Sequence, residues 1–109
     1  MFIIHPTTKS KIEIADKDLD SKMTWEDANN FCSNLGESWR LPTTIELDAI
    51  CKELHSKGEG NFTDTQYWSS TTSPLYMKMG VYNFQEMTAS AYNIAEKYSV
   101  RPVRNFLNK

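Results

Sequence analysis

The chain has 109 residues, a size that corresponds to a single domain with one hydrophobic core. Apolar residues make up 39% of the sequence and aromatic residues 12%, which favours a folded domain over a disordered one. The net charge is −2 and no stretch is strongly basic, so the composition argues against nucleic-acid binding. No apolar run approaches the roughly 20 residues of a membrane-spanning helix, so we expect no membrane insertion.

The N-terminal residues predict two short strands. Phe2–Ile4 and Lys11–Ala15 are rich in β-branched residues, and the second run alternates polar and apolar side chains. His5 and Pro6 interrupt the first run too early for the apolar region of a signal peptide, so we expect no export signal. The sequence leaves the location open between the cytoplasm and a virion.

Two helices are predicted next, each opened by a threonine. Thr24 stands at the N-cap of the first helix, and Gly36 follows its end in a position suited to a left-handed backbone. Thr43 and Glu46 form a capping box at the start of the second helix, which Gly58 ends. The side chains expected to be buried are Trp25, Ala28, Phe31, Cys32 and Leu35 in the first helix and Ile45, Leu47, Ile50, Cys51 and Leu54 in the second.

A short connector, residues 37–42, joins the two helices. It contains Trp39 and Arg40, which we interpret as structural rather than ligand-binding, because a guanidinium beside an indole is suited to stack or pair internally. Leu41 is expected in the core, and Pro42 is expected to set the entry into the second helix.

From Gly60 onward the pattern changes to strands. We predict strands over residues 67–72, over 76–79 and 81–85 on either side of Gly80, and over 98–104. Pro102 cannot donate to a ladder, so it is expected at an edge, a bulge or a strand end. The order of strands, two helices and further strands indicates an α+β fold with a mostly antiparallel sheet.

Five short motifs follow one another along the chain. They are Thr24-Trp25-x-x-Ala28 with Cys32, Trp39-Arg40-Leu41-Pro42-Thr43, Glu46-Leu47, Tyr67-Trp68-Ser69-Ser70-Thr71 and Val100-Arg101-Pro102-Val103-Arg104. In this order, over about residues 24–104, the chain resembles the Lcl C-terminal domain family, bacterial domains typified by the C-terminal domain of a collagen-like adhesin. The resemblance implies one C-type-lectin-like domain over residues 1–109, with two helices against a twisted, mostly antiparallel sheet and with its termini close together.

The same resemblance implies a ligand surface in the irregular segment between the Trp-Ser-Ser and Arg-Pro-Val motifs, here Ser73 to Lys97. Relatives in diversity-generating retroelement systems carry an Asn-rich, mutable run there, and this segment has Asn83 and Asn93; a diversified copy and a fixed relative both remain open. Aromatic and amide side chains offer contact area and adaptable hydrogen bonds, while Met79 and Phe84 are expected to point inward. The predicted ligand-binding residues are Tyr76, Lys78, Tyr82, Asn83, Gln85, Tyr92 and Asn93.

Patterns for catalysis or metal binding are weak. Ser69 and Ser70 lie on a predicted strand without a nucleophile turn or a neighbouring His, so we expect no enzyme activity. Cys51 and His55 stand one helical turn apart, but a zinc site needs three or four ligands, so neither a metal nor another cofactor is expected. We expect Cys32 and Cys51 to be buried free thiols, with a bridge between the two helices as the alternative.

The sequence therefore favours a non-enzymatic recognition module that binds a protein or glycan partner through the segment from Ser73 to Lys97. The alternative is a structural or assembly subunit of a phage or surface complex, in which the same segment forms a homo-oligomer interface.

Overall fold

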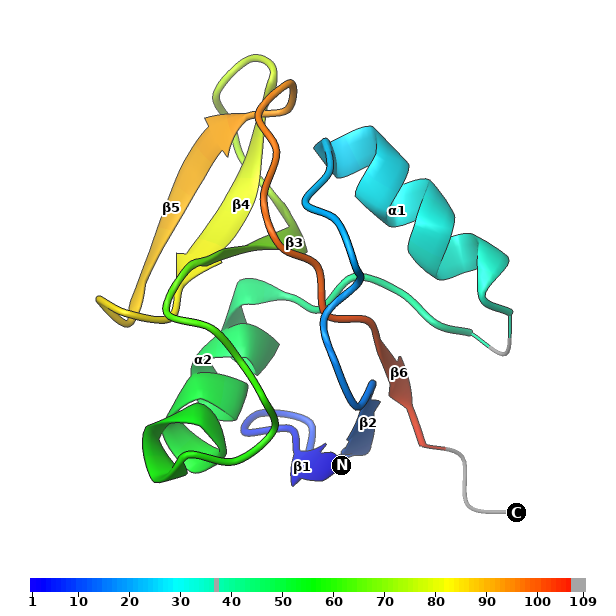
Figure 1. Cartoon of the computed structure of the whole chain (residues 1–109), viewed down its shortest axis with the longest axis vertical. Helices are drawn as coiled ribbons and strands as arrows, with labels where there is room; N and C mark the ends of the chain where they lie inside the picture. Colours follow the sequence, from blue (N-terminus) through cyan, green and yellow to red (C-terminus); the bar gives the residue numbers. More distant parts are fainter. Residues whose placement is uncertain (37, 107–109) are drawn as a thin grey trace.

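The computed structural model describes residues 1–36 and 38–106; residue 37 of the predicted connector and residues 107–109 of the predicted domain lie outside the described part (Figure 1). Its strands form two three-stranded antiparallel sheets: a smaller one of short strands, β1–β2–β6, and a larger one of longer strands, β3–β4–β5. The elements are β1 (Phe2–Ile4), β2 (Lys11–Ile14), α1 (Trp25–Asn34), α2 (Thr44–Glu53), a 3-10 helix η1 (His55–Lys57), β3 (Gln66–Thr72), β4 (Lys78–Asn83), β5 (Thr88–Asn93) and β6 (Val103–Asn105).

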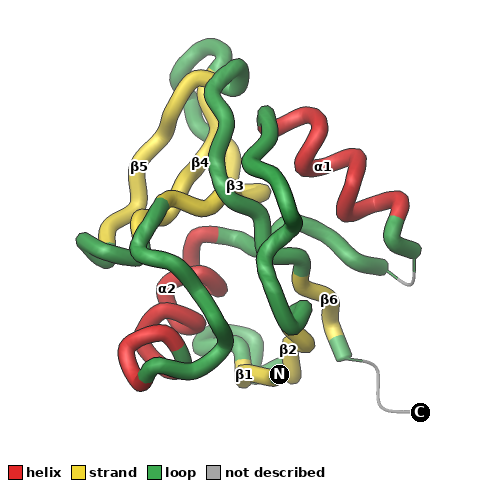
Figure 2. The backbone as a smooth tube through the Cα atoms, viewed as in Figure 1, coloured by secondary structure: helices red, strands yellow, loops and turns green. Residues whose placement is uncertain are grey.

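The α+β class and the antiparallel pairing predicted from the sequence are confirmed, whereas the strands form two sheets where one was expected. The rings of Phe2 and Phe106 lie 5.2 Å apart, so the two ends of the described chain meet beside β2 (Figure 2). None of the helices in the described ranges has both the length and the apolarity to cross a membrane.

The β3–β4 pair separates two apolar clusters because successive strand residues face opposite sides. On β3, Tyr67 belongs to the cluster under α2 and the small sheet, and its neighbour Trp68 belongs to the cluster under α1. On β4, Tyr82 and Val81 divide in the same way. In Figure 1, α1 and α2 accordingly lie against different parts of the larger sheet.

The helix caps form as the sequence predicts. The Thr24 hydroxyl accepts a hydrogen bond from the Asp27 N–H, and Thr43 and Glu46 make both halves of the capping box. Gly36 has a φ of +80°, the left-handed conformation expected after the first helix.

The expected buried faces of both helices are partly wrong. Phe31 and Leu35 of α1 are 46% and 45% exposed, because α1 contacts the sheet through the narrower stripe of Ala28 and Cys32. Ile45 of α2 is 53% exposed. Its neighbour Glu46 is buried instead, since that carboxylate has partners inside the protein, as described below.

The second half of the chain differs from the prediction in its strand boundaries. The two strands expected around Gly80 are one continuous strand, β4, and β5 was not predicted at all. The last expected strand, 98–104, is reduced to β6 and two isolated bridges, at Tyr98 and Ser99. Pro102 directly precedes β6, which confirms its placement at a strand end.

Candidate functional site

The loop between β3 and β4, residues 73–77, presents a group of apolar side chains at one end of the molecule (Figure 1). Leu75 is 55%, Tyr76 90% and Met77 46% exposed. Hydrogen bonds close the loop, because the Leu75 N–H donates to the Ser73 hydroxyl at 3.1 Å and the Lys78 N–H donates to the Leu75 carbonyl at 3.3 Å. The loop therefore holds an aromatic and two aliphatic side chains outward on an ordered backbone.

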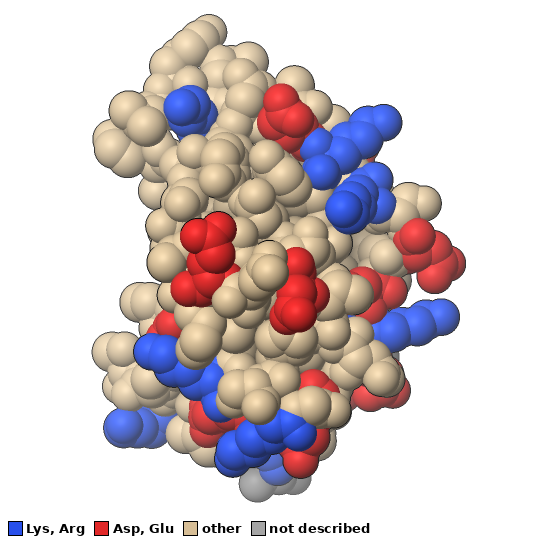
Figure 3. All heavy atoms as spheres, turned by 60° about the vertical axis from the view of Figure 1, so that its left-hand side comes forward, with Lys and Arg blue, Asp and Glu red and all other residues tan. Residues whose placement is uncertain are grey.

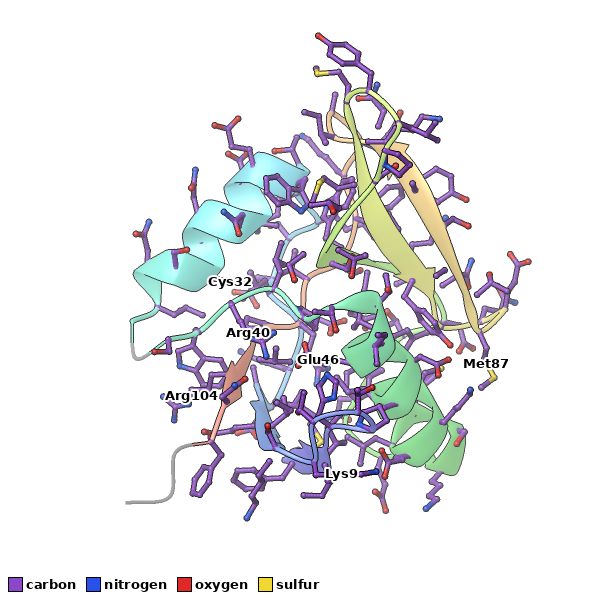
Figure 4. All side chains as sticks on the ribbon, turned by 180° about the vertical axis from the view of Figure 1, so that it is seen from behind. Lys9, Cys32, Arg40, Glu46, Met87 and Arg104 are labelled. Carbon is purple, nitrogen blue, oxygen red and sulfur yellow. The ribbon has the colours of Figure 1, made fainter. Side chains whose placement is uncertain are left out.

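The turn between β4 and β5 is held by Asn83. Its side-chain oxygen accepts hydrogen bonds from the Gln85 and Glu86 N–H groups, at 2.8 and 3.0 Å. Met87, which follows Glu86, adopts a positive φ of 58° and is 42% exposed. Figure 4 shows its side chain on the outside of the hairpin. Asn83 thus shapes the turn, and the side chains presented outward here are Gln85, Glu86 and Met87.

The predicted site residues at the far end of β5 divide between exposure and structure. The ring of Tyr92 is 37% exposed and lies 5.6 Å from the ring of Tyr98. The side-chain oxygen of Asn93 accepts a hydrogen bond from the Ala95 N–H at 2.8 Å, so this amide supports the turn that follows β5. Lys78, which pairs with Asn93 across the two strands, is exposed.

The prediction that Tyr82 presents its ring to a partner is wrong. The side chain is 2% exposed and packs beside Phe84, which is buried as expected, and its hydroxyl donates to the Asp48 carboxylate of α2. Burial and the Asp48 carboxylate both raise the pKa of Tyr82. The error follows from the alternation of side chains along the strand, because Tyr82 and Phe84 lie on the same face, the one that meets α2.

Two adjoining hollows, of about 310 and 220 Å³, separate the start of α2 from the β4–β5 hairpin. Thr44 and Ala89 line both of them. The first is walled by Ile45, Asp48 and Met87, and the second has hydroxyl groups from Thr71, Ser73 and Ser90 around small side chains. The segment from Ser73 to Lys97 therefore carries both a protruding loop and a shallow groove.

A partly buried ion pair fixes the connector between the helices, in the structural role predicted for Arg40. Its guanidinium donates to both carboxylate oxygens of Glu46 at 2.8 Å each, and Figure 4 shows the two side chains pointing toward one another. Burial acts to raise the pKa of Glu46, but the hydrogen bonds from Arg40 and the Thr43 N–H outweigh it, so the pKa lies below its ordinary value. The ring of Trp39 is covered by Arg104, whose guanidinium carbon lies 4.5 Å from its centroid.

Arg101 is a structural centre that the sequence analysis did not single out. The side chain is fully buried and donates to the Asp18 carboxylate at 2.9 Å and to the carbonyls of Ala15, Gly60 and Asn61. It also lies over the ring of Phe62. The sequence feature that indicates this role is a cation inside the apolar run from Val100 to Val103. An Arg in such a run is expected to be buried, and a buried Arg needs several partners. Arg101 therefore ties the segment before β6 to two loops, the one after β2 and the one after η1.

The potentially reactive groups are buried or already paired within the protein. Ser69 is buried, and its hydroxyl donates to the Gly80 carbonyl at 2.8 Å. His55 lies 2.6 Å from the Asp64 carboxylate. Cys32 and Cys51 are buried free thiols, so the alternative of a bridge is wrong, and burial raises the pKa of Cys32 to about 11. Across residues 1–36 and 38–106, no three His, Cys, Asp or Glu side chains are grouped so as to hold a metal ion.

The motifs of the connector, β3 and the C-terminal segment thus build the platform, and the exposed side chains lie between them. The family model of the Lcl C-terminal domain matches residues 7–104. The chain belongs to this family. A search of curated proteins finds no match.

Membership in the Lcl C-terminal domain family agrees with the two helices and antiparallel sheets described above, and the architecture is consistent with a C-type-lectin-like fold. It also indicates a binding or recognition module. The match begins at residue 7, earlier than the motifs from residue 24 onward had indicated, and so includes β2 of the smaller sheet.

Proposed function

We propose that this member of the Lcl C-terminal domain family is a non-enzymatic recognition module that binds a protein or glycan partner through the segment from Ser73 to Lys97. The observation that carries the proposal is the ordered loop 73–77, in which Tyr76 is 90% exposed between two exposed aliphatic residues. A tyrosine fixed on a closed loop loses little conformational entropy when it is buried against a partner, and binding energy concentrates in such aromatic anchors.

The character of the loop narrows the chemistry of the partner. Residues 73–77 contain no charged side chain, and the nearest cation in sequence is Lys78. An apolar pocket of a protein or the flat face of a sugar ring fits an exposed tyrosine with aliphatic neighbours. The hydroxyl groups of Thr71, Ser73 and Ser90 in the adjoining hollow offer hydrogen bonds that would orient a neutral polar ligand.

The predicted site residues are reassigned accordingly. Tyr76, Lys78, Gln85 and Tyr92 are exposed and stay in the proposed surface. Asn83 and Asn93 belong to it as residues that shape the two turns, because their side-chain oxygens already accept backbone hydrogen bonds. Met87 and Leu75 join the surface through their exposure.

A double substitution, Leu75→Ser with Tyr76→Ser, tests the proposal. The wild-type domain is screened on a glycan array and against a displayed peptide library, and the affinity of each hit is measured for both proteins. We expect the double variant to lose at least tenfold in affinity and to keep the thermal unfolding temperature of the wild type, because both side chains are exposed.

The matched control is Phe31→Ser with Leu35→Ser on α1, where an aromatic and an aliphatic side chain are also exposed, by 46% and 45%. This control should retain binding. Loss of binding in the control and retention in the loop variant would instead place the recognition surface at α1.

A further inference from the structure

β5 is an edge strand with an unusual degree of exposure. It is the outermost strand of the β3–β4–β5 sheet, and in Figure 1 no other element lies beyond it. Five of its six residues are exposed and Ala91 is half-buried, so both faces of the strand reach the surface. β5 is therefore an open edge of the sheet.

The direction of the backbone groups along β5 follows from the strand register. In an antiparallel ladder, hydrogen-bonded pairs alternate with non-hydrogen-bonded pairs. The Ile94 N–H donates to the Met77 carbonyl at 2.9 Å, which makes this pair hydrogen-bonded, and counting back along the register makes Ser90 and Val81 a hydrogen-bonded pair as well. The even-numbered residues of β5 therefore bond to β4.

The odd-numbered residues of β5 consequently direct their backbone groups outward. The hydrogen bonds on the other side of β4 follow the same alternation. The Gly80 carbonyl accepts from the Ser69 hydroxyl, and the Phe84 N–H donates to the Thr65 carbonyl, so the backbone groups of the even-numbered residues of this strand point away from β5. Within the described residues, the backbone N–H and C=O groups of Ala89 and Ala91 have no protein partner. They form a short template for one more strand.

The sequence of β5 has none of the features that usually protect such an edge. Natural edge strands are blocked by Lys, Pro, inward charges or bulges. Residues 88–93 are Thr-Ala-Ser-Ala-Tyr-Asn, without charge or proline, and the pairing with β4 is continuous. In Figure 3, which brings this side of the molecule forward, uncharged residues cover much of the surface between the scattered charged groups.

We propose that two copies of this chain associate through their β5 strands, which pair antiparallel about a two-fold axis at Ser90. In this register Ala89 of each copy lies opposite the partner's Ala91, and each such pair exchanges two backbone hydrogen bonds, so the edge gains about four. The two larger sheets become one continuous six-stranded sheet. A symmetric pairing of this kind is closed and stops at the dimer.

The side chains of β5 favour this register and this occupant. Thr88 lies opposite the partner's Tyr92 on one face, a β-branched and aromatic pair of the kind that stabilises sheets. Ser90 meets the partner's Ser90, where two hydroxyls can bond. A register centred on Ala91 would instead place Glu86 opposite the partner's Glu96. Because a two-fold axis sets like residues against each other, an uncharged strand is suited to a second copy of itself.

The inference goes beyond the proposed function. In the dimer Ser90 and Tyr92 contact the second copy, so the loop 73–77 is the part of the proposed ligand surface that stays free. The loop 73–77 lies at the end of β3 and β4, outside the paired edge. Each dimer would carry two such loops, so a partner with repeated sites would be bound with higher avidity. The association does not require that the loop be the ligand surface.

Charged substitutions at the two-fold axis test the proposal. Ser90 is exposed, so Ser90→Asp and Ser90→Lys should fold normally, and each places like charges opposite one another across the axis. Light scattering after size-exclusion chromatography, over a range of protein concentrations, should show a dimer for the wild type and a monomer for each variant. An equal mixture of the two variants should restore the dimer as a heterodimer, because the charges are then opposite.

Gln85→Asp and Gln85→Lys are the matched controls, since Gln85 is exposed in the turn of the same hairpin and outside the paired strands; both should remain dimeric. Leu75→Ser with Tyr76→Ser should also remain dimeric, which separates this inference from the proposed function. A wild type that is monomeric at every concentration overturns the proposal. So does a dimer that persists in both Ser90 variants, or a mixture of them that stays monomeric.

Discussion

At the scale of single residues, the interior of this domain contains charged groups beside the apolar ones. Glu46 is 2% exposed, and its carboxylate is neutralised by Arg40 and bonded by the Thr43 N–H at 2.8 Å. The Nε2 atom of His5 lies 3.9 Å from the same carboxylate, and Arg40 also donates to Asn105. A buried charge with one partner removed is costly, so these residues should be sensitive to substitution.

Arg40→Ala is expected to lower the free energy of unfolding by about 1–3 kcal/mol, because it leaves the Glu46 carboxylate buried with its main partner gone. Urea denaturation of the purified domain measures this directly. Glu46→Gln added to Arg40→Ala should recover part of the loss, since the buried charge is then removed. An unchanged stability accompanied by lost partner binding would show that Arg40 acts at the surface and not as a structural residue.

The same ion pair makes the stability of the domain sensitive to acid. The pKa of Glu46 lies below its ordinary value in the folded state, so its contribution to stability is present above the pKa of the unfolded chain, near 4.5, and is lost as the pH falls through the folded pKa. We expect Glu46→Gln to be less stable than the wild type at pH 7 and the difference to shrink below pH 4.5. Denaturation curves of both proteins between pH 3 and 7 measure this difference in stability. A difference that stays constant over this range would contradict a lowered pKa of Glu46 in the folded state.

At the scale of elements, the sequence predicts best where local chemistry dictates the structure. The caps at Thr24 and Thr43 were predicted because a threonine hydroxyl bonds N–H groups within three residues, a contact that needs no tertiary information. β5 was missed because its alanines and serine carry little β propensity, and pairing with β4 decides its conformation. Ile45 was placed in the core because it is apolar and fits the helical spacing. The spacing does not reveal that Arg40, six residues before Glu46, pairs with that carboxylate and holds it in the interior instead.

The position of the candidate site stays a prediction, and the structure tests only how its residues are exposed and bonded. Its location between Ser73 and Lys97 came from the order of the motifs, and the exposure of Tyr76 and Gln85 agrees with a surface role. The alternation of a strand identifies two faces without saying which is buried, so Tyr82 was misplaced. The turn-forming roles of the two asparagines depend on backbone conformations that residue type alone does not fix.

Gly80→Ala is predicted to destabilise the β3–β4 pairing. A Cβ atom at this position would lie 2.7 Å from the Ser69 hydroxyl oxygen and 2.9 Å from the Thr71 carbonyl oxygen, closer than side chains tolerate. We expect a loss of about 1–3 kcal/mol in the free energy of unfolding. Adding Ser69→Ala should cost less than the two single changes together, because it removes one of the two clashes. Strictly additive losses in a double-mutant cycle would contradict this account.

At the scale of the whole molecule, the two apolar clusters share one wall. Tyr67 and Trp68 are neighbours on β3 but belong to different clusters, and Val81 and Tyr82 divide in the same way on β4. Neither cluster can lose its packing without disturbing the strands that also line the other. The domain should therefore unfold as one cooperative unit, as small single domains usually do.

The two cysteines allow this cooperativity to be measured, because each is buried in a different cluster: Cys51 in the one under α2 and Cys32 in the one under α1. We expect neither thiol to react with a disulfide reagent in the folded protein, since burial excludes the reagent and raises the pKa of both groups. In the variants Cys32→Ala and Cys51→Ala, the remaining thiol should become reactive at one urea midpoint, with the same dependence on urea as global unfolding. If Cys32 reacts at lower urea than Cys51 after correction for the stability of each variant, α1 opens before the rest of the domain and the two clusters are independent.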